Sequence, residues 1–66
     1  MELFRFLVLL RDKNIRITLM NNNGKSIESS TVYDLLEYEW LEQYLDRDIV
    51  DIIPTGNSSF NIKIKD

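Results

Sequence analysis

The chain has 66 residues, of which 11 are acidic and 8 are basic, giving a formal net charge of −3 at neutral pH. It contains no Cys and no His, which excludes disulfides, thiolate or imidazole metal sites, and the commonest nucleophile and general base. A chain of this length forms one domain, residues 1–66, and buries only roughly 60% of its unfolded surface. We therefore expect a small non-enzymatic protein without cofactor or metal, whose modest core favours self-association.

The first predicted element is the run Leu3–Leu10, which is apolar apart from Arg5. It is far shorter than the roughly 20 residues that span a bilayer. The start Met1–Glu2 and the absence of Ala do not fit a signal peptide. We predict a buried β-strand in a cytoplasmic protein that makes no contact with a membrane.

Polar turns flank the second predicted strand, Ile15–Met20. Arg11–Asn14 has the length and composition of a hairpin loop, so it predicts that Ile15–Met20 pairs with Leu3–Leu10. Apolar and polar residues alternate along Ile15–Met20, which predicts one apolar face. Asn21–Gly24 ends in Asn-Gly, a pair that tolerates the positive φ of a hairpin turn. A short strand, Lys25–Ser29, is predicted to return.

A helix is predicted after this hairpin. Ser30 and Thr31 are suitable N-cap residues, and Asp34 follows Thr31 by three positions, as in a capping box. No Gly or Pro interrupts the sequence between Thr31 and Leu45 or Asp46. We therefore predict one continuous helix up to about that point.

The C-terminal part predicts a second hairpin. Asp48–Ile53 has the composition of a strand, and Pro54, which cannot donate a hydrogen bond, is predicted to end it. The polar segment Thr55–Ser59 then turns into Phe60–Lys65, where apolar residues alternate. The predicted order is β-β-β-α-β-β. This is an α+β domain in which one amphipathic helix packs across an antiparallel sheet of about four to five strands.

The predicted helix has two apolar arcs. At about 100° per residue, one arc holds Val32, Tyr33, Leu36, Trp40 and Tyr44, and the second holds Tyr38, Leu41 and Leu45. A helix that only covers a sheet needs one apolar stripe, so the second arc suggests a further partner, either a second protomer or a target protein. The alternative is that Tyr38 and Leu41 pack under the C-terminal hairpin of the same chain.

Acidic side chains concentrate on this helix. Glu39, Glu42 and Asp46 are spaced i, i+3 and i+7, which predicts an exposed row between the arcs. Residues 34–51 hold seven acids and one base, a charge of −6, whereas residues 1–25 hold five bases and two acids, a charge of +3. Such a field attracts a basic protein surface and repels a nucleic-acid backbone. The alternative is an ordinary solvated face that keeps the protein soluble.

Several features recur together between Asn14 and Ile52. They are an apolar strand, three polar turn residues followed by Gly-Lys, and a helix in which Trp40 is followed four positions later by Tyr44. With these features the chain resembles the small dimeric uracil-DNA glycosylase inhibitors encoded by certain tailed phages of Gram-positive bacteria. That family has Glu directly after the first aromatic residue, where this chain has Leu41.

The resemblance implies a homodimer that inhibits uracil-DNA glycosylase as a DNA mimic. Such enzymes bind DNA in a basic groove and insert an apolar wedge into the minor groove. In the family, carboxylates take the place of phosphates, and an apolar recess between the helices of two protomers takes the wedge. The partner-binding residues implied are Trp40, Leu41 and Tyr44, which line or support the recess, and the phosphate mimics Glu37, Glu39, Glu42 and Asp46.

Two other functions remain open at this point. The same acidic helix suits the basic groove of another nucleic-acid enzyme, such as a restriction or CRISPR nuclease. A structural or assembly subunit would use the second apolar arc only to form an oligomer. Direct nucleic-acid binding is disfavoured, because the sequence pI is about 4.8 and that function needs a basic patch.

Overall fold

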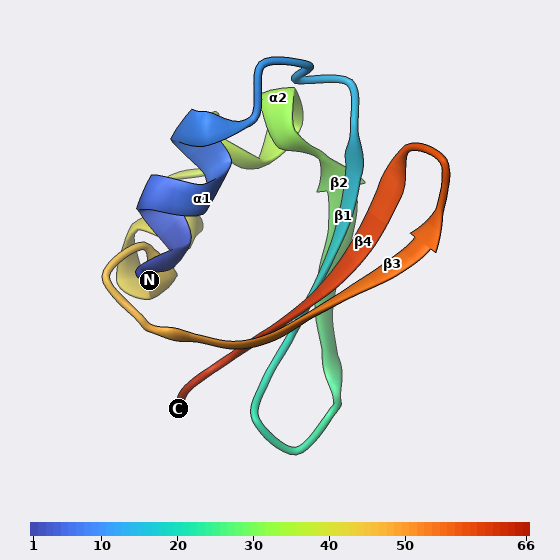
Figure 1. Cartoon of the computed structure of the whole chain (residues 1–66). Coiled ribbons are helices and arrows are strands. Elements are labelled where there is room, and N and C mark those ends of the chain that lie inside the picture. Colours follow the sequence, from blue (N-terminus) through green and yellow to red (C-terminus); the bar gives the residue numbers. More distant parts are fainter.

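A computed structural model describes residues 1–66 as two layers, a β-sheet and a set of helices that cover one of its faces (Figure 1). The elements in chain order are α1 (Leu3–Leu9), β1 (Arg16–Met20), β2 (Ser26–Thr31), α2 (Val32–Leu35), the 3₁₀ helix η1 (Glu39–Tyr44), β3 (Ile49–Gly56) and β4 (Ser59–Ile64). The predicted α+β class and a sheet of four strands are confirmed. The predicted element order is wrong at the start, where a helix stands in place of the first strand.

The sheet consists of two hairpins joined by a parallel pair of strands. The strand order is β2-β1-β4-β3, and the pairs β1–β2 and β3–β4 are antiparallel, as predicted. The central strands β1 and β4 run parallel, with Leu19 beside Ile62, so the expectation of a fully antiparallel sheet is wrong. Parallel neighbours require a long connection. Residues 21–58, which contain β2, α2, η1 and β3, provide it.

The first hairpin turns at Gly24, whose φ is +86°. Gly adopts positive φ without steric cost. The Asn21 side-chain oxygen accepts hydrogen bonds from the backbone N–H groups of Asn23 at 3.0 Å and Lys25 at 2.9 Å. The turn that the Asn-Gly pair predicts is therefore confirmed, and the Asn21 side chain stabilises it.

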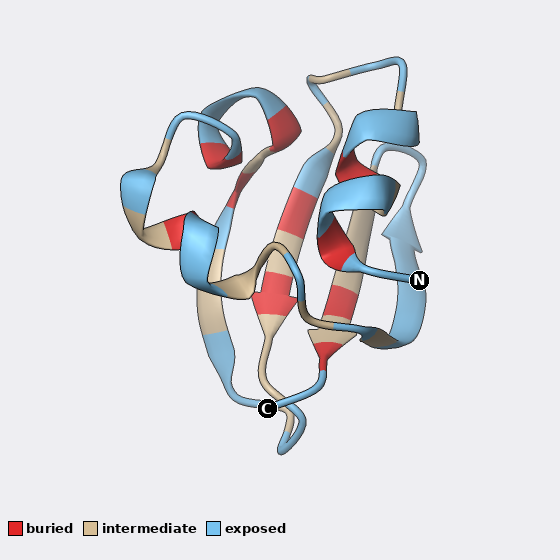
Figure 2. Ribbon diagram, turned by 90° about the vertical axis from the view of Figure 1, so that its left-hand side faces the viewer, coloured by how far each residue is buried: buried red, intermediate tan, exposed pale blue.

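The hydrophobic core lies between the central strands and the helices. Its nine residues are Ile17 and Leu19 of β1, Ile62 and Ile64 of β4, and Leu3, Leu7, Val32, Leu35 and Leu41 from the helical layer. Figure 2 shows the buried positions where the helices face the sheet. The edge strands β2 and β3 contribute no buried apolar residue. The core is therefore centred on the β1–β4 pair.

The N-terminal run is a helix, so the strand predicted for Leu3–Leu10 is wrong. Leu3 and Leu7 are buried, and Phe6 and Leu10 pack against the core beside them. These positions follow the i, i+3, i+4, i+7 pattern of a helix. A run that is apolar at nearly every position fits the helical and the strand period equally well, so its pattern alone does not distinguish them.

The tetrapeptide Arg11–Asn14 ends α1 and leads into β1, so it is not the hairpin loop that its composition predicts. The Lys13 ammonium donates a hydrogen bond of 3.1 Å to the carbonyl of Leu7 and further bonds to the carbonyls of Val8 and Leu10. The last carbonyls of a helix lack partners within it, and a cation there also interacts favourably with the helix dipole. Lys13 thus caps α1.

The continuous helix predicted from Thr31 to about Asp46 is divided into α2 and η1, so that prediction is wrong in length. Thr31 caps α2 as predicted, since its hydroxyl accepts the N–H of Asp34 at 3.2 Å. The backbone becomes extended at Tyr38, with φ −78° and ψ 122°. The Tyr38 ring packs against the core, and its hydroxyl lies 3.3 Å from the Ser30 hydroxyl. Core packing overrides the helix propensity of this segment.

The last hairpin is longer than predicted. β3 passes through Pro54 and ends at Gly56, and β4 begins at Ser59. Pro is tolerated on an edge strand when its nitrogen faces away from the neighbouring strand. The strand end predicted at Pro54 is therefore wrong, whereas the hairpin itself is confirmed.

Replacing Leu7 or Leu9 by Ala tests whether the N-terminal run is helical. The two side chains would share one face of a strand, but in α1 Leu7 is buried and Leu9 is 67% exposed. We expect Leu7→Ala to lower the free energy of unfolding by about 2–5 kcal/mol, and Leu9→Ala to change it by less than about 0.5 kcal/mol. Urea denaturation followed by circular dichroism measures both. Equal losses would contradict the helix.

Candidate partner-binding surface

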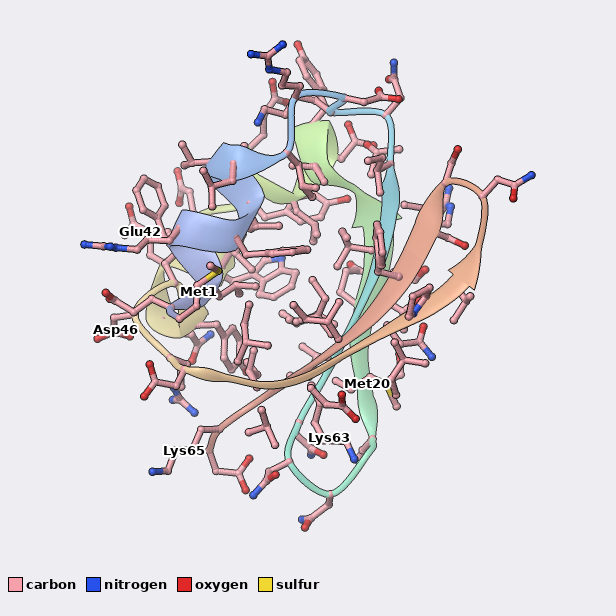
Figure 3. All side chains as sticks on the ribbon, viewed as in Figure 1. Met1, Met20, Glu42, Asp46, Lys63 and Lys65 are labelled. Atoms are coloured by element: carbon pink, nitrogen blue, oxygen red, sulfur yellow. The ribbon has the colours of Figure 1, made fainter.

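The acidic residues singled out in the sequence lie on and around η1. Glu39 and Glu42 are exposed, and their spacing of three residues places them on one side of a 3₁₀ helix, which has three residues per turn. Asp46 follows in the next turn, and Glu37 precedes η1; both are also exposed. In Figure 3, Glu42 and Asp46 point away from the sheet on the helical side of the molecule. These four carboxylates are therefore available to a partner, although they do not lie on one α-helix.

Three aromatic rings form a cluster on the same segment. The rings of Tyr38 and Trp40 stack with centroids 5.5 Å apart, and Trp40 meets Tyr44 edge to face at 6.1 Å. The Arg47 guanidinium lies 5.2 Å from the centre of the Tyr44 ring, a cation–π distance. All three rings are half-buried and pack against the core. The rings of Trp40 and Tyr44 thus pack between η1 and the core, and part of each ring stays exposed to solvent.

Leu41 does not belong to this accessible surface. It is 1% exposed and is one of the nine core residues. The alternative that Leu41 and Tyr38 pack within their own chain agrees with the structure, because both contact the core. The side chain of Leu41 is therefore too buried to contact a partner directly. It can only support the exposed residues of η1 from the core.

The outer face of α1 is an apolar surface that the sequence analysis missed. Phe4, Val8 and Leu9 are exposed there. Together with Arg5 they line a shallow groove of about 310 Å³. The sequence does contain a sign of this surface, because Leu3–Leu10 is apolar at nearly every position. A helix of that composition has an apolar outer face as well as an apolar face towards the core.

Backbone hydrogen bonds fasten α1 to the end of the acidic segment. The N–H of Leu3 donates to the carbonyl of Arg47 at 2.9 Å, and the N–H of Phe4 donates to the carbonyl of Leu45 at 3.0 Å. These bonds satisfy N–H groups that have no partner within the first turn of a helix. As a result, the carboxylate of Asp46 and the apolar face that begins at Phe4 are neighbours on the surface. The two features combine into one surface, which we call the η1–α1 surface.

Basic residues lie both on this surface and outside it. Arg5 lines the apolar groove and Arg47 lies over the Tyr44 ring, whereas Lys63 belongs to β4. Lys63 pairs with Met20 across the β1–β4 ladder and with Asp51 across the β3–β4 ladder. In Figure 3, Lys63 lies along the sheet, well away from Glu42 and Asp46. The charge separation along the sequence is therefore only partly a separation in space, because Arg5 lies on the η1–α1 surface itself.

The η1–α1 surface combines exposed carboxylates with exposed apolar side chains. No group of three or more acidic side chains is close enough together to hold a metal ion. No helix has the length and apolar character needed to cross a membrane. Comparison with protein-family models, with curated proteins and with solved structures finds no match for this chain.

Comparing Leu41→Ala with Leu36→Ala tests whether Leu41 belongs to the core. We expect Leu41→Ala to lower the free energy of unfolding by about 2–5 kcal/mol, because it leaves a cavity in the core. Leu36 is 40% exposed, so the same substitution there should cost less than half as much. Urea denaturation of both variants is the measurement. A larger loss for Leu36→Ala would contradict the assignment of Leu41 to the core.

Proposed function

We propose that this protein is a protein inhibitor of uracil-DNA glycosylase that acts as a DNA mimic. The observation that carries the proposal is the η1–α1 surface, in which exposed carboxylates border an exposed apolar helix face. The partial sequence resemblance described above supplies the identity of the target. The charge of −6 over residues 34–51 supports a basic partner.

The carboxylates would occupy the positions of DNA phosphates. An enzyme that flips a base out of DNA binds the phosphate backbone with Lys and Arg side chains in a groove. Carboxylates accept the same charge-assisted hydrogen bonds as phosphates, and bidentate geometry is available to both. Glu37, Glu39, Glu42 and Asp46 are exposed and carry such oxygens outward from the helical layer.

The apolar part of the surface would receive the wedge of the enzyme. A side chain that separates base steps is apolar and is presented at the centre of the DNA-binding groove. Phe4, Val8 and Leu9 provide an apolar groove beside the carboxylates. Trp40 and Tyr44 lie beneath the acidic segment and keep it in place, with Leu41 behind them in the core. A partner that is basic around an apolar protrusion therefore matches both halves of this surface.

A titration of the protein into a uracil-DNA glycosylase assay tests the proposal, and the double variant Glu39→Lys with Glu42→Lys tests its mechanism. We expect the wild type to inhibit stoichiometrically. The variant should associate about 10 to 1000 times more slowly at low salt, because clustered charges steer encounter over that range. Its association rate should also depend less on salt, which screens such charges. Stopped-flow fluorescence at several salt concentrations measures both.

The matched control is Asp12→Lys with Asp66→Lys. Both of these residues are exposed and lie outside the η1–α1 surface, and the control changes the net charge by the same amount. It should keep the steep salt dependence of the wild type. Equal association rates for the two double variants would show that only net charge matters, and absence of inhibition by the folded wild type would refute the proposed target.

A further inference from the structure

The tip of the β1–β2 hairpin holds the only Asn-Gly pair of the chain, Asn23–Gly24. It lies at the end of the sheet away from α2 (Figure 1). Asn is a thermally labile residue, because the backbone nitrogen that follows it can attack its side-chain amide carbon. Gly in the next position has no side chain to hinder this attack, and no atom lies within 4 Å of the place that a Cβ of residue 24 would take. Asn23 is also exposed to water, which the reaction consumes.

The folded turn keeps the reacting groups apart. The N–H of Gly24 donates to the carbonyl of Asn21 at 2.9 Å, which makes a β-turn with Asn22 and Asn23 at its centre. Neither central residue has a positive φ, so the turn is of type I, in which the ψ of Asn23 is about 0°. The cyclic imide needs the Asn23 Cβ and the Gly24 nitrogen eclipsed about the Cα–C bond, and at that ψ they are about 120° apart. Ring closure therefore requires the turn to open.

The Asn21 side chain holds the turn closed. Its oxygen accepts the N–H of Asn23 at 3.0 Å and the N–H of Lys25 at 2.9 Å, one on each side of Gly24. Asn22 contributes its backbone N–H, which donates to the Asp66 side chain at 3.4 Å. Removing the Asn21 side chain therefore makes opening easier, whereas removing the Asn22 side chain leaves every one of these bonds in place.

We propose that Asn23 is a site of spontaneous deamidation, and that the Asn21 side chain sets its rate in the folded protein. When the turn opens, the Gly24 nitrogen gives up its proton and forms a bond to the Asn23 Cγ. The side-chain nitrogen takes up a proton and leaves as ammonia. Water then opens the cyclic imide at one of its two carbonyl carbons, which gives aspartate or isoaspartate. The net reaction consumes one water and releases one ammonia for each chain.

The modification changes both the charge and the shape of the hairpin tip. A carboxylate in place of the Asn23 amide adds one negative charge to the net charge of −3. The new charge lies one residue from Asn22, so it repels the Asp66 carboxylate that accepts the Asn22 N–H. Isoaspartate also lengthens the backbone between Asn21 and Lys25, which disrupts the hydrogen bonds that join them. The η1–α1 surface lies on other elements, so this inference does not depend on the proposed function.

Asn21→Ala and Asn22→Ala form a matched pair that tests the control by Asn21. Each variant removes one Asn side chain from the turn and keeps the Asn23–Gly24 pair. We expect Asn23 to deamidate about fivefold faster in folded Asn21→Ala than in the wild type, the factor that corresponds to one ordinary hydrogen bond. Asn22→Ala should keep the wild-type rate. In concentrated urea all three chains should react equally fast, and faster than when folded. Peptide mass spectrometry during incubation at mildly alkaline pH measures these rates.

Asn57, in the turn of the β3–β4 hairpin, is the internal reference within each chain. Its rate should be the same in the wild type and in Asn21→Ala, because opening of the first turn is a local event. Gly24→Ala is the control for the chemistry, and it should slow the reaction at Asn23 at least tenfold in urea, where its added methyl group hinders the attack.

Four results would overturn the proposal. The folded wild type could react as fast as the unfolded chain, or Asn21→Ala could react no faster than Asn22→Ala. Asn21→Ala could accelerate Asn57 as much as Asn23, which would mean that the whole fold opens. Gly24→Ala could leave the rate in urea unchanged, which would exclude attack by the backbone nitrogen.

Discussion

The parallel pairing of β1 with β4 is the contact on which the rest of this structure depends. It places Ile17, Leu19, Ile62 and Ile64 side by side on one face of the sheet. Four adjacent aliphatic residues must be removed from water, and at about 25 cal/mol per Å² their burial is a large favourable term for so short a chain. The helical layer provides the cover, and the long connection that a parallel pair requires contains α2 and η1. The topology of the sheet therefore determines where the acidic segment can lie.

The η1–α1 surface arises from the same constraint. The chain leaves α2 early, because Tyr38 and Leu41 pack inward towards the central strands. The short 3₁₀ turn that results directs Glu39 and Glu42 outward on one side. The carbonyl groups of Arg47 and Leu45 then accept hydrogen bonds from the N–H groups of Leu3 and Phe4, which brings an apolar helix face next to the carboxylates. The same segment therefore contributes Leu41 to the core and exposes Glu39 and Glu42 on its outer side.

Local chemistry explains which elements could be predicted from the sequence. The Asn21–Gly24 turn and the Thr31 cap depend on residues within a few positions of each other, and both predictions are confirmed. The nature of the Leu3–Leu10 run and the break at Tyr38 depend on packing between distant segments, which periodicity does not reveal. Exposure of the acidic residues follows from their charge, whereas burial of Leu41 follows only from the position of η1 over the sheet.

The central claim is that the η1–α1 surface is the part of the molecule that recognises a partner. The most direct measurement is a two-dimensional NMR titration of the isotopically labelled protein with unlabelled uracil-DNA glycosylase. The account predicts that amide shifts change in η1 and along the outer face of α1, while those of Thr18 and Asn61 on the open face of the sheet stay constant. Shift changes centred on that open face, or no changes at stoichiometric enzyme, would contradict it.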